Sequence, residues 1–344
     1  MFGKVKDRTS MAEVLRGTRA GRIQSVGYMQ VIPLISNLTD DRFVSPTEGQ
    51  ARVSTTGYGT LDFDNPSEAV LIVPCHAGYV VKQAAQDHAM SHAGLVAGGK
   101  RRAFNTAVCI QQNQGGLIRH GNYRMLILPF PLREPALKLR KKREYNRLWH
   151  AIGAFNRTLG VPAWGHLEYF LNRFRKELDQ FVAEFECVPK QLGAIILVDG
   201  RVVGIERAPN HDYWRSVWPC LIRECYGSLA IQVARSRGET SPPPSTRVPL
   251  AETTDSLDEL ADAVADAAAE EERRAETIVR ELLMEPFATE VDDHVAGLTL
   301  ETLSHARFAG QVVRDGERVV YASILAKRRR LLEQEWERAA AFSI

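Results

Sequence analysis

One stretch of the sequence combines residue types and spacing that could bind an anion. Residues 94–100 read GLVAGGK, which satisfies the spacing G-x-x-x-x-G-K of a phosphate-binding loop. An ATP-type loop continues with Ser or Thr and opens a helix, whereas here Arg101 follows and FNTAVCIQ predicts a strand. Two interpretations remain: a glycine turn whose backbone N–H groups and cations hold an anion, or a β-turn with exposed basic residues.

This glycine-lysine turn is where we expect any ligand to bind. Glycine lacks a Cβ, so its backbone can adopt positive φ and approach a ligand closely, and arginine can meet a phosphate with two parallel hydrogen bonds. Strand alternation should turn some of the following side chains away from the ligand. The predicted ligand-binding residues are Gly98, Gly99, Lys100, Arg101, Arg102, Asn105 and Thr106.

Two histidines are weak candidates for a metal site. His88 and His92 are four residues apart beside Asp87, and Cys75-His76 lies upstream. No spacing matches a zinc module, so a solvated or core-capping pair is the favoured interpretation, and we predict no metal site. The sequence contains no G-x-S-x-G, H-E-x-x-H or G-x-G-x-x-G motif, so catalytic residues, cofactors and enzymatic activity are left open.

Composition excludes several classes of protein. The 344 residues are 44% hydrophobic and 25% charged, which is typical of a globular chain and excludes a disordered or collagen-like one. The net charge of +2 gives no global attraction to nucleic acid or membrane. Five cysteines without a CxxC pair favour reduced thiols, and the sequence has neither a secretory leader pattern nor a run of 18 apolar residues. We therefore expect a cytoplasmic protein with no membrane span.

The order of elements predicts an α+β fold. Residues 1–131 consist of short β-branched and aromatic runs separated by turn residues, which predicts a β-rich sandwich or barrel-like sheet. Residues 132–235 predict a helical part with a hairpin at 192–207 around Asp199-Gly200. Helices are expected at 140–158, at 167–185 and at 212–235, where Pro219 should bend, break or start the last one. Along 167–185 the apolar residues step by 4, 3, 4, 3, 4, which predicts one buried stripe.

The last third of the chain predicts a linker, an acidic helix and a return to strands. Residues 236–250 contain three consecutive prolines and predict an extended linker. Residues 251–285 carry 12 acidic and 3 basic residues, and Ser256 with Glu259 fits a capping box for a long acidic helix. Residues 286–344 predict C-terminal strands and a basic helix over 325–342. The segment around Asp315-Gly316 repeats the plan of the first hairpin, with Gly310 matching Gly193, so the two hairpins could pair in one sheet.

Four segments together resemble one protein family. They read VAGGKRRAFNTAVCI, QLGAIILVDGRVVGIE, YWRSVWPCLIRECYGSLAI and FAGQVVRDGERVVYASIL, and they occur in this order. They resemble the domain family associated with ADP-ribosylglycohydrolases and rhodanese-phosphatases, which is largely uncharacterised and occurs in bacteria and phages. The resemblance implies a link to NAD, ADP-ribose or nucleic-acid repair. In the family the glycine-lysine turn continues with Gln, Asn and Arg, whereas here Arg101 and Arg102 follow Lys100.

These observations support three functional hypotheses. The first is a domain that binds or processes a nucleotide-like anion, such as NAD, ADP-ribose or an RNA end. The alternative is a non-enzymatic structural or assembly protein, for example a component of a phage particle, and a homo-oligomer or larger assembly is expected. The third is a nucleic-acid-binding accessory, because residues 138–147 are basic and Tyr145 and Trp149 lie close by for stacking.

Overall fold

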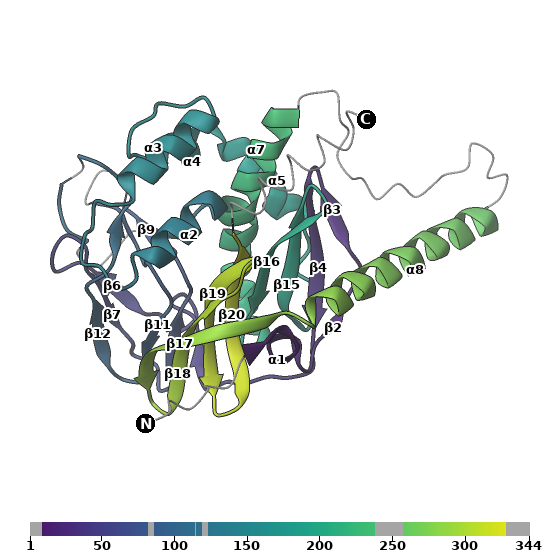
Figure 1. The fold of residues 1–344 in the computed structure, drawn as a ribbon, viewed down its shortest axis with the longest axis horizontal. Helices are drawn as coiled ribbons and strands as arrows, with labels where there is room; N and C mark the ends of the chain where they lie inside the picture. Colours follow the sequence, from purple (N-terminus) through teal and green to yellow (C-terminus); the bar gives the residue numbers. More distant parts are fainter. Residues whose placement is uncertain (1–8, 82–85, 114, 119–122, 238–256, 328–344) are drawn as a thin grey trace.

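The computed structural model describes residues 9–81, 86–113, 115–118, 123–237 and 257–327. Its architecture is α+β with a β-rich N-terminal region, as the sequence predicted (Figure 1). One large antiparallel sheet is built from the two ends and the middle of the chain, and three small sheets come from the first 127 residues.

The large sheet has ten strands, all paired in antiparallel fashion. The central strands β15, β16 and β20 are almost entirely buried, so the core of the molecule lies against them. In spatial order the strands are β1 (Thr9–Ser10), β17 (Pro286–Val295), β18 (Leu298–Ser304), β19 (Phe308–Asp315), β20 (Arg318–Ala326), β16 (Arg201–Arg207), β15 (Gln191–Val198), β4 (Met29–Ile35) and β2 (Arg19–Ala20), with β3 (Gln24–Val26) also on β4.

The remaining N-terminal strands form three small sheets beside the large one. The first contains β13 (Val108–Cys109), β10 (His88–Ala89), β9 (Ala77–Val80) and β14 (Arg124–Ile127). The second contains β11 (Gly94–Val96), β8 (Val70–Val73) and β5 (Phe43–Val44), and the third contains β12 (Arg101–Phe104), β7 (Leu61–Asp64) and β6 (Arg52–Ser54). The turn between β11 and β12 holds the glycine-lysine sequence.

Both Asp-Gly hairpins exist and lie in one sheet, since β15–β16 and β19–β20 meet where β16 pairs with β20. Asp199 and Gly200 have φ of 53° and 73°, which a two-residue hairpin turn of this kind requires. Gly193 and Gly310, which match in the repeated plan, both allow a close approach of the neighbouring strand. A Cβ on Gly193 would lie 2.2 Å from the Glu206 carbonyl oxygen, and one on Gly310 would lie 2.2 Å from that of Ser323.

Helices cover the large sheet and the small sheets (Figure 1). After α1 (Met11–Leu15), the helical middle contains α2 (Phe130–Lys138), α3 (Trp149–Thr158), α4 (Leu167–Arg173) and α5 (Arg175–Glu184). The helix predicted for 140–158 begins only at Trp149, and the single helix predicted for 167–185 is interrupted at Phe174, whose φ and ψ are −107° and 20°. The predicted stripe is nevertheless buried throughout, because both short helices turn the same side inward.

The third helical segment is continuous but changes its winding. Asn210 caps α6 (His211–Cys220) by accepting a hydrogen bond from the Tyr213 N–H at 2.7 Å, and α7 (Gly227–Arg237) ends the segment. Between them lies the π-helix η1 (Leu221–Tyr226), which begins two residues after Pro219. Because proline has no N–H, it removes one α-helical hydrogen bond, and the widened turn that follows is where Glu224, Cys225 and Tyr226 enter the core.

The acidic helix α8 (Leu257–Leu282) extends away from the rest of the protein (Figure 1). Its 26 residues span about 39 Å. Its C-terminal half packs on the body through Ala275 and Leu282, which are buried, and Glu271 accepts a 2.9 Å ion-pair hydrogen bond from Arg22. None of the helices in the described ranges is long and apolar enough to cross a membrane.

Three sequence predictions concern residues that lie partly or wholly outside the described ranges: the linker, its capping residue Ser256 and the C-terminal basic helix. Residues 238–256, which include most of the predicted linker and the capping residue Ser256, lie outside the described ranges. The basic helix predicted for 325–342 cannot begin at Leu325, because β20 continues to Ala326 and pairs with β16 and β19. Residues 328–344 lie outside the described ranges.

The paired glycines give a test of this architecture. Gly193→Ala and Gly310→Ala should each lower the free energy of unfolding by more than about 2 kcal/mol, because the added Cβ overlaps a backbone carbonyl that cannot move alone. Gly57→Ala is the control, since a Cβ there meets nothing within 4 Å, and it should change stability by less than about 0.5 kcal/mol. Urea unfolding followed by circular dichroism measures all three; equal stabilities would contradict the close strand approach.

Candidate functional site

A groove of about 350 Å³ brings together three segments that are far apart in the sequence. One segment surrounds β12, the second follows α2, and the third lies on β17 and β18. The groove is lined by His92, Arg102, Ala103, Phe104, Asn105, Thr106, Arg140, Lys141, Asp292, Asp293 and Leu300. Three of the seven predicted ligand residues, Arg102, Asn105 and Thr106, therefore lie in it.

The glycine turn itself lies outside the groove lining. Gly99 has a φ of 63° and donates its N–H to the Ser67 carbonyl at 2.8 Å, so this N–H is occupied. A Cβ on Gly98 would lie 2.0 Å from the Glu68 carbonyl oxygen, which explains the glycine by close packing of two chain segments. Lys100 is exposed at the end of the turn, and its own carbonyl accepts a hydrogen bond from the Asn65 N–H.

Strand alternation separates the two arginines that follow the turn. Arg101 pairs with Asp62 on the neighbouring strand β7, with nitrogen–oxygen distances of 2.6 and 2.9 Å. Arg102 points to the groove, where its Nη1 donates to Asp293 at 2.6 Å and to the Leu95 carbonyl at 3.0 Å. Its guanidinium also lies 5.0 Å from the centre of the Phe104 ring. Among the described residues nothing accepts a hydrogen bond from its Nε or Nη2, so one edge of the guanidinium can still bind a ligand.

The opposite wall of the groove is a set of ion pairs that sequence reasoning missed. Arg140 donates to Asp292 at 3.3 Å and to Glu290, and the Lys141 ammonium lies 2.5 Å from Glu290. The basic run at 133–147 and the adjacent aspartates at 292–293 were visible in the sequence, but both looked like ordinary solvated surface. Only the fold of β17 beside α2 brings these segments together.

His92 is held neutral with a defined tautomer. Its Nδ1 lies 2.5 Å from the Ala93 carbonyl oxygen, which can only accept, so Nδ1 carries the proton. Nε2 is then the acceptor for the Thr106 hydroxyl at 3.1 Å. Burial lowers the pKa of His92, although Asp292 and Asp293 oppose the shift. A neutral imidazole beside a hydroxyl can accept a proton from it, or from a ligand hydroxyl placed there.

The other histidine of the candidate metal pair is structural. His88 is fully buried on β10, with Nδ1 2.8 Å from the Gln86 carbonyl and Nε2 accepting from the Gly59 N–H at 3.1 Å. The two histidines do not face one another across a helix, because His88 is in a strand. Among the described residues no group of three or more His, Cys, Asp or Glu side chains could hold a metal ion.

Behind the groove lies a buried cluster of polar residues centred on an arginine. Arg133 is fully buried on α2 and donates to Glu206 at 2.7 Å, to His76 Nδ1 at 3.1 Å and to the Ser323 hydroxyl. Tyr226 donates its hydroxyl hydrogen to the same Glu206 oxygen at 2.6 Å. Burial, together with the Arg133 charge, holds the pKa of His76 well below its usual range, so the imidazole is neutral.

One glutamine links this cluster to the groove. Gln311 on β19 donates to Asp292 in the groove at 3.0 Å, and its carbonyl oxygen accepts from the Ala93 N–H at 2.7 Å and from the Cys75 thiol at 3.5 Å. Burial raises the pKa of Cys75 to about 12, so this thiol stays protonated and is not an activated nucleophile. The groove wall is therefore fixed from behind by hydrogen bonds to buried residues.

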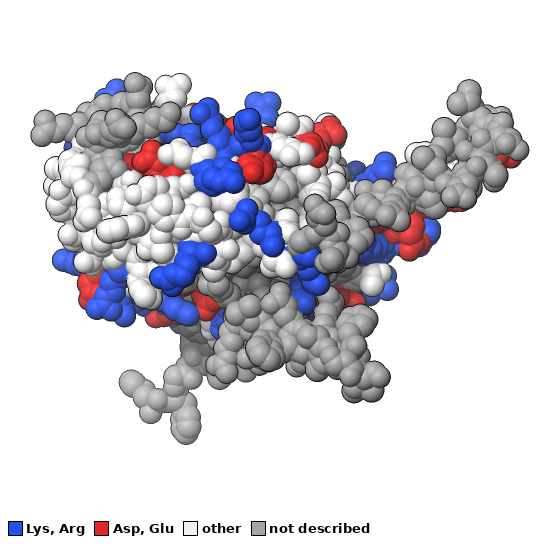
Figure 2. Space-filling view, turned by 90° about the horizontal axis from the view of Figure 1, so that it is seen from above, with Lys and Arg blue, Asp and Glu red and all other residues white. Residues whose placement is uncertain are grey.

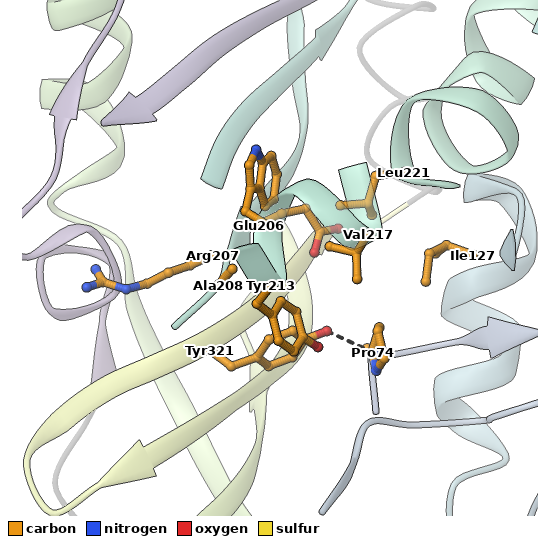
Figure 3. Close-up of a pocket in the computed structure, with 11 residues that line it drawn as sticks. Pro74, Ile127, Glu206, Arg207, Ala208, Tyr213, Val217, Leu221 and Tyr321 are labelled. Atoms are coloured by element: carbon orange, nitrogen blue, oxygen red, sulfur yellow. Dashed lines mark hydrogen bonds between the residues drawn. The ribbon is translucent and has the colours of Figure 1, made fainter. Parts of the chain in front are cut away.

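A much smaller cavity is lined by Glu206 and its neighbours (Figure 3). Its volume of about 10 Å³ is about enough for one water molecule. The side chains of Glu206, Tyr213, Val217 and Tyr321 surround it, and the Tyr321 hydroxyl accepts a hydrogen bond from the Cys75 N–H at 2.8 Å. This cavity is too small for a substrate. The groove is the candidate functional site because Arg102, Asn105 and Thr106 line it together with the Arg140 and Asp292 side chains.

The molecule is thus an α+β protein with a mixed-charge groove supported by a buried arginine. Residues 17–325 match the family model of the ARG and Rhodanese-Phosphatase-superfamily-associated Protein domain. The chain belongs to this family, which confirms the resemblance found in its sequence. No curated protein and no solved structure matches the chain.

The buried ion pair can be tested by changing one or both partners. Arg133→Met should destabilise the protein by about 3–5 kcal/mol, because it leaves the Glu206 carboxylate buried without a cation. The double variant Arg133→Met/Glu206→Met should recover most of that loss, because no unpaired charge remains. Lys138→Ala removes an exposed ion pair with Glu134 and serves as the control, with an expected cost below about 0.5 kcal/mol. A double variant no more stable than Arg133→Met would contradict this interpretation.

His88 should make stability depend on pH. Burial lowers its pKa to about 4, below the value of about 6.5 expected in the unfolded chain. As the pH falls from 6.5 towards 4, the unfolded chain therefore binds a proton that the folded protein does not, and the free energy of unfolding decreases. Between pH 7 and pH 5 the wild type should lose about 2 kcal/mol more than His88→Gln.

The exposed His150 provides the control for this measurement. Urea titrations at both pH values should give His150→Gln the same pH dependence as the wild type. If His88→Gln also retains the full wild-type pH dependence, the burial of a neutral His88 is wrong.

Proposed function

We propose that the protein binds a nucleotide-like anion, with ADP-ribose or NAD as the reference ligands, in the groove between β12, α2 and β17. The observation that carries the proposal is the Arg102 guanidinium, which lies in the groove with one edge unused by the described residues. Such an edge can make two parallel hydrogen bonds to a phosphate. The family association with ADP-ribosylglycohydrolases points to the same class of ligand.

The mixture of charges in the groove suits a nucleotide better than a simple anion. Arg102, Arg140 and Lys141 provide cations for phosphate oxygens. Asp292, Asp293 and the Nε2 atom of His92 are acceptors, and ribose hydroxyls need acceptors. A bare sulfate or phosphate would meet these carboxylates at a cost, whereas a sugar phosphate could satisfy both sets.

The test compares groove residues with the glycine turn. Arg102→Gln and Arg140→Gln should each weaken ADP-ribose binding by about tenfold to a hundredfold, which corresponds to about 1.5–3 kcal/mol for a charge-assisted hydrogen bond. Lys100→Ala is the matched control, because Lys100 is exposed outside the groove lining. Isothermal titration with ADP-ribose, NAD and ATP measures the affinities. If both groove variants bind ADP-ribose as tightly as the wild type, or if Lys100→Ala loses more affinity than they do, the groove is not the binding site. The glycine-lysine turn is then again the candidate.

The second candidate function is structural assembly, and α8 favours it. The N-terminal half of this helix extends away from the body with Asp262, Asp266 and Val264 exposed (Figure 1). An acidic helix presented in this way could bind another subunit. Light scattering on the full chain distinguishes the candidates: a stable oligomer that binds none of the three nucleotides would favour assembly.

A further inference from the structure

Exposed aromatic side chains form a track that leads away from the groove. Among the described residues, six large apolar side chains are more than a third exposed, and three of them are aromatic: Tyr58 at 50%, Trp164 at 58% and Tyr169 at 38%. Single exposed apolar residues need no explanation, but exposed aromatic residues that are linked through the residues between them do.

Ring contacts connect Tyr58 to Tyr145 and Trp149, and Trp149 lies against the loop that carries Trp164. Tyr58 stacks on Tyr145 with ring centres 5.5 Å apart and planes 28° from parallel, and Tyr145 meets the edge of Trp149 at 5.9 Å. Trp149 in turn touches the 160–166 loop, since a Cβ on Gly165 would lie 2.6 Å from the Trp149 Cβ. We call Tyr58, Tyr145, Trp149, Trp164 and Tyr169 the aromatic track.

The far end of the aromatic track is held rigidly on α3. The side-chain amide of Asn156 is buried and donates to the Trp164 and His166 carbonyls at 3.1 and 2.9 Å. The imidazole of His166 lies 5.2 Å from the Tyr169 ring. Trp164 is therefore exposed although the backbone that carries it is fixed, which is what a stacking platform requires.

Cations connect the groove to the start of the track. Lys141 lines the groove and is followed by Lys142 and Arg143, both exposed, before Tyr145. No described carboxylate pairs with Lys142 or Arg143, whereas Arg147 pairs with Glu144. Figure 2 shows one face of the molecule, on which several Lys and Arg side chains lie among mainly uncharged residues. Lys142 and Arg143 thus add positive charge beside Tyr145, although the whole chain has a net charge of only +2.

We propose that this surface binds a single-stranded nucleic acid whose terminal nucleotide occupies the groove. Phosphates would meet Lys142 and Arg143, and bases would stack on Tyr58 and on Trp164, because every base offers a flat face to an aromatic ring. The proposal rests on the proposed nucleotide site and extends it: the ligand is the end of a strand, and the aromatic track binds the nucleotides that precede it.

The test measures fluorescence anisotropy of a 5′-fluorescein 12-nucleotide uridine RNA, and of the matching thymidine DNA, with the full chain. Trp164→Ala and Tyr58→Ala should each weaken binding about 5- to 150-fold, the range expected for losing one base stack. Met284→Ala and Leu38→Ala remove exposed apolar side chains elsewhere and should change nothing. Trp164→Phe keeps an aromatic face and should restore most of the affinity. A preference for RNA over DNA would identify the 2′-hydroxyl as part of the recognition.

Salt dependence tests the cations separately. Lys142→Ala/Arg143→Ala should reduce the slope of log affinity against log salt by about 1.4, which corresponds to two single-strand phosphate contacts. Arg175→Ala/Lys176→Ala removes two exposed cations on α5 and should leave the slope unchanged. If both double variants show the same salt dependence of affinity, the proposed path of the nucleic acid over Lys142 and Arg143 is wrong.

Nucleotide binding separates the failure of this proposal from the failure of the groove. The aromatic variants should bind ADP-ribose with wild-type affinity, and Arg102→Gln should weaken both ADP-ribose and the strand. If ADP-ribose binds but neither strand binds more tightly than it does, the aromatic track is overturned and the groove stands. If nucleic-acid binding depends on Trp164 but Arg102→Gln changes the affinity for neither ligand, the aromatic track is supported and the groove is not the nucleotide site.

Discussion

The structure depends on one buried charge, the guanidinium of Arg133. A buried arginine is costly unless a carboxylate and further acceptors surround it, and here Glu206, His76 and Ser323 do so from three different parts of the chain. Glu206 and Ser323 face one another across the β16–β20 pairing, which is where the two Asp-Gly hairpins join. Arg133 thus ties α2, and with it the segment that carries Arg140, to the β16–β20 pairing.

The same set of contacts explains why the groove wall is ordered. Gln311 on β19 reaches Asp292 on one side and accepts from the Cys75 thiol on the other, next to His76. The carboxylate that faces Arg140 is therefore fixed by the core and does not depend on surface ion pairs alone. A groove with such a wall keeps its acceptors in place before a ligand arrives, which reduces the entropy lost on binding.

The sequence predicts the structure correctly where local rules decide it. The Asp-Gly turns, the buried stripe over 167–185 and the acidic helix follow from turn chemistry and periodicity, and all three are present. The break at Phe174 was missed because the stripe continues across it. Of the predicted ligand residues, Arg102, Asn105 and Thr106 line the groove, whereas Gly98 and Gly99 pack against residues 67 and 68. Arg140 and Asp292 are separated by 152 residues, so no local pattern could have joined them.

The strand that carries the groove carboxylates is also an open edge. Only Pro286 and Phe287 of β17 are covered, by the two residues of β1, so the described part of the sheet ends with most of this strand unpaired on one side. An exposed edge of this length invites strand pairing between molecules, and charged side chains are a common protection against it. Glu290, Asp292 and Asp293 stand on that edge. Replacing them with neutral residues to favour an anion would therefore also favour aggregation, so the acidity of the groove serves the protein's behaviour in solution as well as its ligand.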